Sequence, residues 1–340
     1  MKPASDAQSP DAADLRRRFV ACLGRTPESA ELAPRVERRE RGDGYTRELV
    51  SFAASPGVRV PAWVLIPDGL GGPAPAVLVL HQHNGEYHLG KNEPVGLAGN
   101  RDVAFAHELA QRGFVCIAPD MEAFEDRRAS AEDHARWRAA RTAVASSYGG
   151  PDGPRDGDYE RFVATKHILE GSSLQARYTF DARRTIDYLV TRPEIDPTRI
   201  GAIGHSLGGQ QTVWALAADA RLRCGVSSCG ISTLATMLRD GINHNFACYA
   251  PGVLAVGDLD ALVASLAPTP LMLATGATDI LFPIDGVRRI GAVADAAYRA
   301  AGAGDAFRLL ELDGGHAAPE AARREMYAWL TRWLAPAARR

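Results

Sequence analysis

The chain has 340 residues, of which 46% are hydrophobic, so it can bury a substantial core as one large domain or two small ones. Its net charge of -2, with acids and bases interspersed, argues against a nucleic-acid partner. No run approaches the ~20 apolar residues that cross a bilayer, and the five cysteines include two in or beside apolar runs, which suggests reduced thiols. We therefore expect a cytoplasmic protein with no membrane association.

Residues 1–34 are predicted to form an N-terminal extension. Its first residues are rich in Pro, Ala, Ser and Asp, lack the apolar core of a signal peptide, and are expected to be a disordered lead. A helix is predicted over 11–22, and Thr26-Pro27 is typical of a cap that opens a second short helix.

The rest of the chain, 35–340, is predicted to be one α/β domain. Segments 35–41, 45–53 and 58–67, separated by Gly- and Pro-containing turns, predict antiparallel strands. Beyond them, continuous apolar runs alternate with amphipathic segments, which indicates a doubly wound, mostly parallel sheet with helices on both faces. The predicted buried strands are 76–80, 114–118, 200–203, 224–228, 270–274 and 307–312, and the predicted helices are 101–112, 174–190, 207–218, 286–300 and 319–334.

Two long segments interrupt this alternation. The first, at about 121–173, is polar and turn-rich and is predicted to be an insertion after the strand ending near Asp120. Such insertions form lids or pocket walls about as often as surface decorations. The second, 230–267, carries His244, Asn245 and Phe246, which are candidates for substrate binding.

Residues 200–209 place a serine in the pattern Gly-x-Ser-x-Gly between a predicted strand and a predicted helix. A serine hydroxyl is a poor nucleophile unless it is held within reach of a base, and a strained strand-to-helix turn presents it in this way. Glycine at 204 and 208 relieves crowding in such a turn. Ser206 is therefore the predicted nucleophile.

A serine nucleophile needs a histidine base and a carboxylate that orients it. Asp279 follows the predicted strand 270–274, and His316 follows the strand 307–312, so the three residues occur in the order Ser, Asp, His. Asp285 is the nearest competing acid, but it lies after an apolar loop and is also placed to cap the next helix. We expect Asp279 and His316 to complete a catalytic triad.

The loop after strand 76–80 is expected to supply part of an oxyanion hole. One donor is the backbone N–H of Leu207, and the second is that of His83, with Gln82 as the alternative; His81 is a further candidate for substrate contact. His-x-His also occurs in metal sites, so a metal-dependent hydrolase that uses His81 and His83 is a rival interpretation. It leaves the serine motif unexplained, and we expect neither a metal nor a cofactor.

The chain resembles the dienelactone hydrolase and acetyl xylan esterase-like branch of the α/β-hydrolases. The resemblance is carried by 77–83, 118–120, 187–201, the Ser206 motif, 276–279 and 314–316, and it spans roughly 58–334. It implies a serine esterase that acts on a small-molecule ester through Ser206, Asp279 and His316. A peptidase or acyltransferase with the same triad, and a binding protein that has lost catalysis, are the alternatives. The sequence does not indicate the acyl or alcohol specificity or the oligomeric state.

Overall fold

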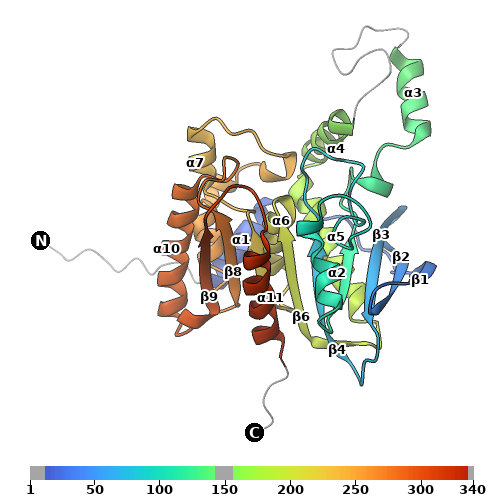
Figure 1. Cartoon of the computed structure of the whole chain (residues 1–340). Coiled ribbons are helices and arrows are strands. Elements are labelled where there is room, and N and C mark those ends of the chain that lie inside the picture. Colours follow the sequence, from blue (N-terminus) through green and yellow to red (C-terminus); the bar gives the residue numbers. More distant parts are fainter. Residues whose placement is uncertain (1–11, 142–155, 336–340) are drawn as a thin grey trace, which may run out of the picture.

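The computed structural model describes residues 12–141 and 156–335, which form a nine-stranded sheet with helices on both faces (Figure 1). The strand order is β1-β2-β3-β5-β4-β6-β7-β8-β9. The strands span Arg35–Arg41 (β1), Tyr45–Ser55 (β2), Val58–Pro67 (β3), Ala74–Leu80 (β4), Val115–Pro119 (β5), Ile195–His205 (β6), Leu222–Ser228 (β7), Leu271–Gly276 (β8) and Phe307–Leu312 (β9).

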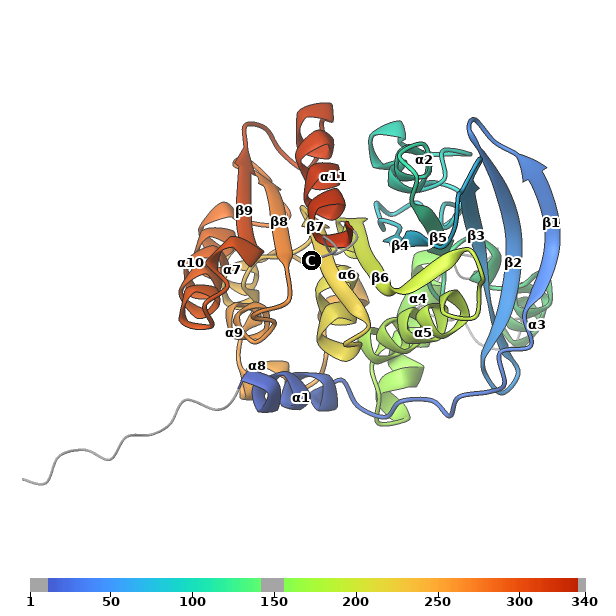
Figure 2. The same cartoon turned by 90° about the horizontal axis from the view of Figure 1, so that it is seen from below.

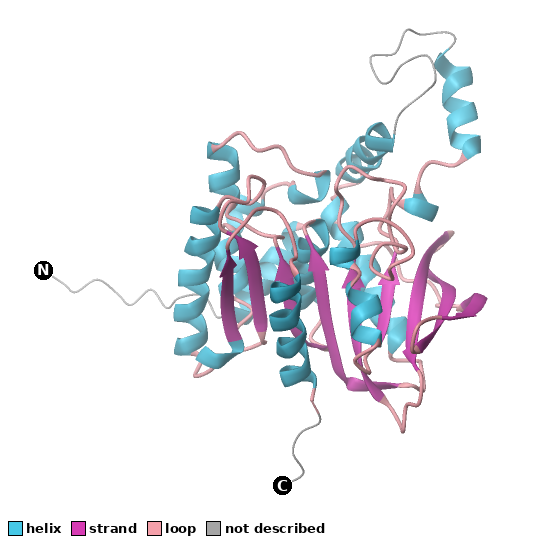
Figure 3. Cartoon of the chain, in the orientation of Figure 1, coloured by secondary structure: helices cyan, strands magenta, loops and turns pink. Residues whose placement is uncertain are grey.

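The sheet begins antiparallel and continues parallel, as the sequence predicts. Strands β1, β2 and β3 pair as a meander, and β3 is antiparallel to β5. From β5 onward all pairings along the sheet are parallel. Strands β4, β5, β7 and β8 are buried along nearly their whole length, which explains the mostly apolar sequences of β4, β5 and β8. The parallel strands point to one end of the molecule, where the long loops gather (Figure 3).

Helices cover the two faces of the sheet and divide the core into two layers. On one face α1, α5, α6 and α10 pack over a large apolar cluster, and on the other face α2 and α11 cover a second cluster (Figure 2). These helices span Ala12–Cys22 (α1), Phe105–Ala110 (α2), Leu174–Leu189 (α5), Leu207–Ala218 (α6), Ile284–Ala300 (α10) and Glu320–Leu334 (α11). This confirms the predicted α/β architecture.

The prediction of a second helix near Thr26-Pro27 is wrong. Residues 24–34 have no helical turn and run as an extended segment beside the end of β2. The Ala53 N–H donates to the Leu32 carbonyl at 2.7 Å, and the Ala30 N–H donates to the Ala54 carbonyl at 3.2 Å. These bonds to β2 satisfy the backbone groups that a helix would have paired internally.

The predicted helix over 101–112 is also interrupted. A 3₁₀ turn, η1 (Arg101–Val103), ends at Ala104, and α2 begins one residue later. The N–H groups of Ala106 and His107 donate to the Pro94 carbonyl at 2.9 and 3.2 Å. An acceptor from the preceding loop therefore replaces the one that a continuous helix would offer.

Each of the two long segments folds into short helices near the loop-bearing end of the sheet. The first contains η2 (Glu125–Arg127), α3 (Ala131–Arg141) and α4 (Asp156–Leu169), and the second contains α7 (Leu234–Arg239), η3 (Phe246–Cys248), α8 (Val253–Val256) and α9 (Leu259–Ala264). The predicted disordered lead and the turn-rich part of the first segment, 148–154, fall outside the described residues. Among the helices that are described, none combines the length and the apolar character needed to cross a membrane.

Candidate active site

Ser206 occupies a strained junction between β6 and α6. Its backbone has φ 55° and ψ -121°, a conformation that non-glycine residues seldom adopt. A Cβ atom on Gly204 would lie 2.3 Å from the Gly208 carbonyl carbon, and one on Gly208 would lie 2.0 Å from the Leu80 carbonyl oxygen. Both neighbours are backbone atoms that cannot move aside, so only glycine fits at these two positions. The sequence thus forms the tight strand-to-helix turn that the motif predicts.

The turn is fixed to the neighbouring strand and opens into a pocket. The N–H of Ser206 donates to the Ser228 carbonyl at 2.8 Å, at the end of β7. Ser206 lines a pocket of about 860 Å³ together with His316. The walls of this pocket come from the loop after β4, from α4, from the segment 243–246 and from the loop after β8.

Asp279 and His316 meet at the ends of β8 and β9. The Asp279 Oδ2 lies 2.8 Å from the Nδ1 of His316, and the Asp279 side chain is 0% exposed. Its other oxygen accepts hydrogen bonds from the N–H groups of Leu281 at 2.9 Å and Phe282 at 3.3 Å. Burial alone would raise the pKa of Asp279, but the hydrogen bond and charge of His316, followed by the two backbone donors, lower this pKa below its ordinary value. Asp279 is therefore held as a carboxylate.

The imidazole of His316 lies between two other rings. Its centroid is 4.8 Å from that of His205 and 5.7 Å from that of Phe282. Because Asp279 engages the Nδ1, the Nε2 is the nitrogen that remains for a proton transfer. His205 does not compete as a base, because it is buried and its Nδ1 bonds the Ser228 hydroxyl at 3.0 Å. Burial also lowers the pKa of His205 to about 3.

The candidate oxyanion donors are backbone N–H groups of the serine turn and of the loop after β4. Leu207 is the first residue of α6, so its N–H has no acceptor within the helix. Within residues 12–141 and 156–335, no hydrogen bond is made by the backbone N–H of Leu207, His83 or Gln82. His83 lines the pocket, whereas the buried Gln82 side chain is turned to Glu93, to which it donates at 2.8 Å. His83, with Gln82 as the alternative, therefore stays a prediction for the loop's contribution.

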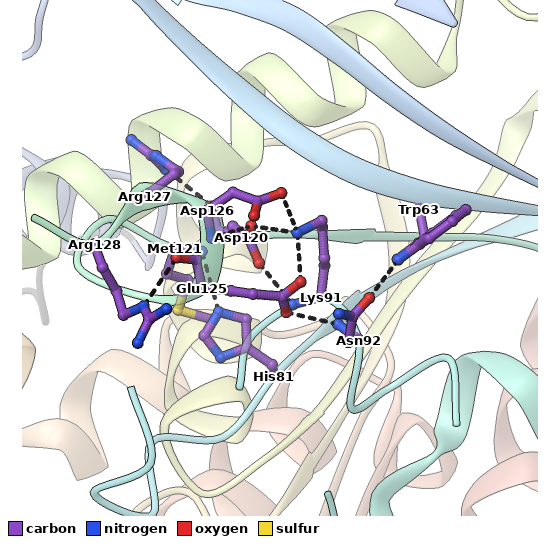
Figure 4. A network of polar contacts seen from close by, with 10 residues as sticks. All are labelled: Trp63, His81, Lys91, Asn92, Asp120, Met121, Glu125, Asp126, Arg127 and Arg128. Carbon is purple, nitrogen blue, oxygen red and sulfur yellow. Dashed lines mark hydrogen bonds and ion pairs between the residues drawn. The ribbon is translucent and has the colours of Figure 1, made fainter. Parts of the chain in front are cut away.

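His81 lies away from the pocket and connects two loops. Its Nδ1 donates to the Gln82 carbonyl at 2.8 Å, and its Nε2 accepts the Met121 N–H at 3.1 Å (Figure 4). Burial lowers its pKa to about 4, so the ring stays neutral. Both nitrogens are used within the protein, which leaves none for a substrate or a metal. In the described part of the chain, the His, Cys, Asp and Glu side chains that gather closely enough to bind a metal form two clusters, and neither includes His81 or His83.

A buried lysine stabilises the same two loops and was not anticipated from the sequence. The ammonium group of Lys91 lies 2.9 Å from Asp120, 2.5 Å from Glu125 and 2.7 Å from Asp126 (Figure 4). Burial opposes its charge, but these carboxylates raise the pKa of Lys91 above its ordinary value. The backbone N–H of Lys91 also donates to Asp120 at 2.7 Å. The loop after β4 is thereby fastened to the loop after β5.

Of the candidate substrate residues, the pocket brings together His244, Asn245 and Phe246. The Nε2 of His244 donates to the Leu281 carbonyl at 2.7 Å, and its ring packs on Phe282, with centroids 4.5 Å apart. Helix α4 adds Glu160, which was not predicted from the sequence. No local motif marks this residue, because its position depends on how α4 folds back over the loop after β4.

Two buried neutral histidines predict a loss of stability in mild acid. Burial lowers the folded-state pKa of His81 to about 4 and that of His205 to about 3. Between these values and about pH 6.5, the unfolded chain therefore binds more protons than the folded chain. Each pH unit below 6.5 then costs about 1.4 kcal/mol for each histidine. Asp120 opposes this loss, because burial raises its pKa to about 7 and the folded chain takes up a proton there between pH 7 and pH 5. The quantity to measure is therefore how much further the urea unfolding free energy falls from pH 7 to pH 5 in wild type than in His205→Gln, which we expect to be about 2 kcal/mol.

His81 and Asp120 are unchanged in His205→Gln, so the comparison isolates His205, and the titration of Glu122 does not contribute between pH 7 and pH 5. The His167 hydrogen bond and nearby cationic groups outweigh burial and lower the pKa of Glu122 to about 2, so protonation of Glu122 weakens the fold only below about pH 4.5. The same fall in wild type and in His205→Gln would contradict the assignment of His205 as neutral.

The sheet, the strained serine turn and the strand-end residues define an α/β-hydrolase. The chain belongs to this superfamily: residues 13–218 match the Abhydrolase family, and residues 176–337 match the Prolyl oligopeptidase family. It is 26% identical over 325 residues to the protein named "Putative hydrolase YtaP" of Bacillus subtilis (strain 168), covering 95% of this chain and 99% of that protein. Membership of the α/β-hydrolases, as expected from the sequence, is confirmed.

Solved structures of esterases share the fold. A structure described as a putative acetyl xylan esterase from Bacteroides fragilis NCTC 9343 superposes with a TM-score of 0.69 at 18% identity, covering 94% of this chain and 81% of that one. The glucuronoyl esterase from Solibacter usitatus superposes with a TM-score of 0.66 at 18% identity, covering 98% and 95% of the two chains. At these identities the likeness shows a common fold.

Proposed function

We propose that the protein is a serine hydrolase of carboxylic esters, with Ser206 as nucleophile, His316 as general base and Asp279 as the carboxylate that orients His316. The observation that carries this proposal is the 2.8 Å contact between His316 Nδ1 and the buried Asp279, in a histidine that lines the same pocket as Ser206. The esterase names of the structural neighbours support the ester bond as the target.

The proposed reaction has two halves. In the first, His316 takes the Ser206 proton as the hydroxyl oxygen bonds to the ester carbonyl carbon, and the carbonyl oxygen becomes an oxyanion held by the N–H groups of Leu207 and His83. His316 then gives its proton to the departing alkoxide, which leaves as the alcohol, and an acyl-enzyme remains. In the second half, water loses a proton to His316 as its oxygen attacks the acyl carbon, and His316 then returns this proton to the departing Ser206 oxygen, which releases the acid and restores both residues.

Asp279 serves this cycle by position and by charge. Its hydrogen bond fixes the ring of His316, and its negative charge stabilises the imidazolium that forms in each half-reaction. The backbone donors of Leu281 and Phe282 hold the carboxylate in place. His205 remains neutral beside His316 and adds no opposing charge.

A peptidase with the same three residues is the second candidate, because residues 176–337 match the Prolyl oligopeptidase family. Comparing p-nitrophenyl esters of increasing acyl length with small peptide p-nitroanilides separates the two candidates. Higher kcat/KM for the esters supports the esterase, and higher kcat/KM for the anilides supports the peptidase.

A fluorophosphonate probe tests the proposed nucleophile directly. Such probes react with serines that an adjacent base activates, so we expect one covalent adduct, located by mass spectrometry at Ser206. The Ser206→Ala protein and the heat-denatured wild type are the controls and should stay unlabelled. A well-folded wild type that forms no adduct, or forms it at another serine, would refute the assignment and favour a non-catalytic binding protein or a different nucleophile.

A further inference from the structure

Glu160 brings a buried carboxylate from α4 to the wall of the pocket that contains Ser206. Its side chain is 3% exposed. The Oε2 accepts hydrogen bonds from the Nε2 of His83 at 3.0 Å and from the hydroxyl of Tyr87 at 2.7 Å. The Oε1 is also buried, yet it has no hydrogen-bond partner in the part of the chain that the structure describes. A buried carboxylate oxygen without a donor is costly, so this atom has unused capacity to accept one.

The hydrogen bonds around His83 show why only one of the two carboxylate oxygens of Glu160 has donors. The N–H of Gly85 donates to the Nδ1 of His83 at 3.0 Å, so the ring carries its proton on the Nε2. That proton is donated to Glu160 Oε2, and the Tyr87 hydroxyl donates to the same oxygen. Both donors therefore converge on Oε2, and neither one satisfies Oε1.

Two asparagines of the pocket offer the complementary kind of group. The Asn243 Oδ1 accepts the Tyr249 hydroxyl at 2.8 Å, and the Asn245 Oδ1 accepts the Ala247 N–H at 3.1 Å. Their amide oxygens are thus occupied, which leaves the NH₂ groups as donors, and both residues line the pocket with Glu160. A hydroxyl group can donate to a carboxylate and accept from an amide, whereas an ammonium group can only donate.

We propose that Glu160 forms a subsite for a substrate hydroxyl group, which donates its hydrogen bond to Oε1. This inference rests on the proposed esterase function and extends it: the preferred substrates are esters that carry a free hydroxyl group on the alcohol or on the acyl part. Glu160 is then a specificity-determining residue, in addition to holding the ring of His83. A site built to pair with a hydroxyl discriminates strongly against an analogue that lacks it, because its polar group is left unpaired.

The experiment compares substrates that differ only by a hydroxyl in place of a methyl group. For the alcohol part the pairs are 2-hydroxyethyl and propyl acetate, and 4-hydroxybutyl and pentyl acetate. For the acyl part they are ethyl glycolate and ethyl propionate, and ethyl 3-hydroxypropanoate and ethyl butanoate. The quantity measured is the ratio of kcat/KM within each pair, which does not depend on the fraction of enzyme that is folded. In Glu160→Gln, we expect this ratio to fall about tenfold relative to wild type for at least one pair, since a hydrogen bond to a charged group is lost.

Tyr87→Phe is the matched control, because it removes a donor to Oε2 and leaves Oε1 unchanged. It should alter both members of each pair equally, as should any purely structural effect of loosening His83. Identical ratios in wild type and Glu160→Gln for every pair would overturn the subsite. Glu160→Asp, which shortens the side chain, provides a second variant and should also lose the preference.

The outcome separates this inference from the function on which it rests. If no ester is hydrolysed in a Ser206-dependent way, the proposed function fails. If hydrolysis depends on Ser206 but the ratios are the same with and without the Glu160 carboxylate, only the subsite fails.

Discussion

Ser206→Ala should lower kcat for ester hydrolysis by about 10⁵-fold or more, leaving only the small acceleration that binding and oxyanion contacts provide. The reason is chemical: without the hydroxyl there is no atom at the β6–α6 turn that can form the acyl-enzyme. Alanine carries the same backbone preferences as serine at φ 55°, so the turn itself should persist. The measurement is steady-state hydrolysis of p-nitrophenyl acetate by both proteins.

The control for Ser206→Ala is its unfolding transition, which should match that of wild type within about 0.5 kcal/mol because alanine keeps the backbone hydrogen bond from residue 206 to the Ser228 carbonyl. A correctly folded Ser206→Ala protein that hydrolyses the ester at the wild-type rate would refute Ser206 as the nucleophile, and with it the proposed mechanism.

Asp279→Asn should lower kcat by about 10³- to 10⁴-fold while the pocket keeps its shape. An amide in this position can donate to the Nδ1 of His316, which favours the ring tautomer with its proton on the Nε2 and so blocks the base from accepting the Ser206 proton. It also removes the negative charge that stabilises the imidazolium. The readout is the ester hydrolysis rate, together with a loss of fluorophosphonate labelling at Ser206.

Asp285 provides a matched control, because it is the alternative candidate for the triad carboxylate in the sequence. Asp285 is half exposed and forms an ion pair with Arg239 at 2.5 Å. Because that contact lies at the surface, Asp285→Asn should change stability by no more than about 1 kcal/mol and leave kcat unchanged. If Asp285→Asn proved as damaging to catalysis as Asp279→Asn, the assignment of the triad acid would be wrong.

Much of the sheet could be predicted because parallel strands that are covered on both faces have nearly continuous apolar sequences. The apolar runs at β4 and β8 have no polar alternation, and the predicted strand 307–312 has the bounds that the structure shows. The contact between His316 and Asp279 followed from the same logic, since residues after neighbouring parallel strands meet at one edge of the sheet.

The remaining features depend on contacts between distant segments, which local patterns do not encode. The break at Ala104 arises because Pro94 supplies an acceptor from another loop. Lys91 is an ordinary charged residue in the sequence, and only the fold surrounds it with carboxylates. Glu160 approaches His83 because α4 folds over the loop after β4, and nothing within that helix specifies this arrangement.

The packing of α1 on α6 has a consequence for the order in which the protein is made. Phe19 of α1 is fully buried, and its ring meets that of Trp214 of α6 edge-on with centroids 6.4 Å apart. Phe19 leaves the ribosome long before Trp214 is synthesised, so the apolar surface of α1 stays uncovered until α6 has been made. Contacts between such distant segments slow folding and expose apolar groups meanwhile. The helix that is synthesised early therefore completes its packing late, on the helix that begins at the serine turn.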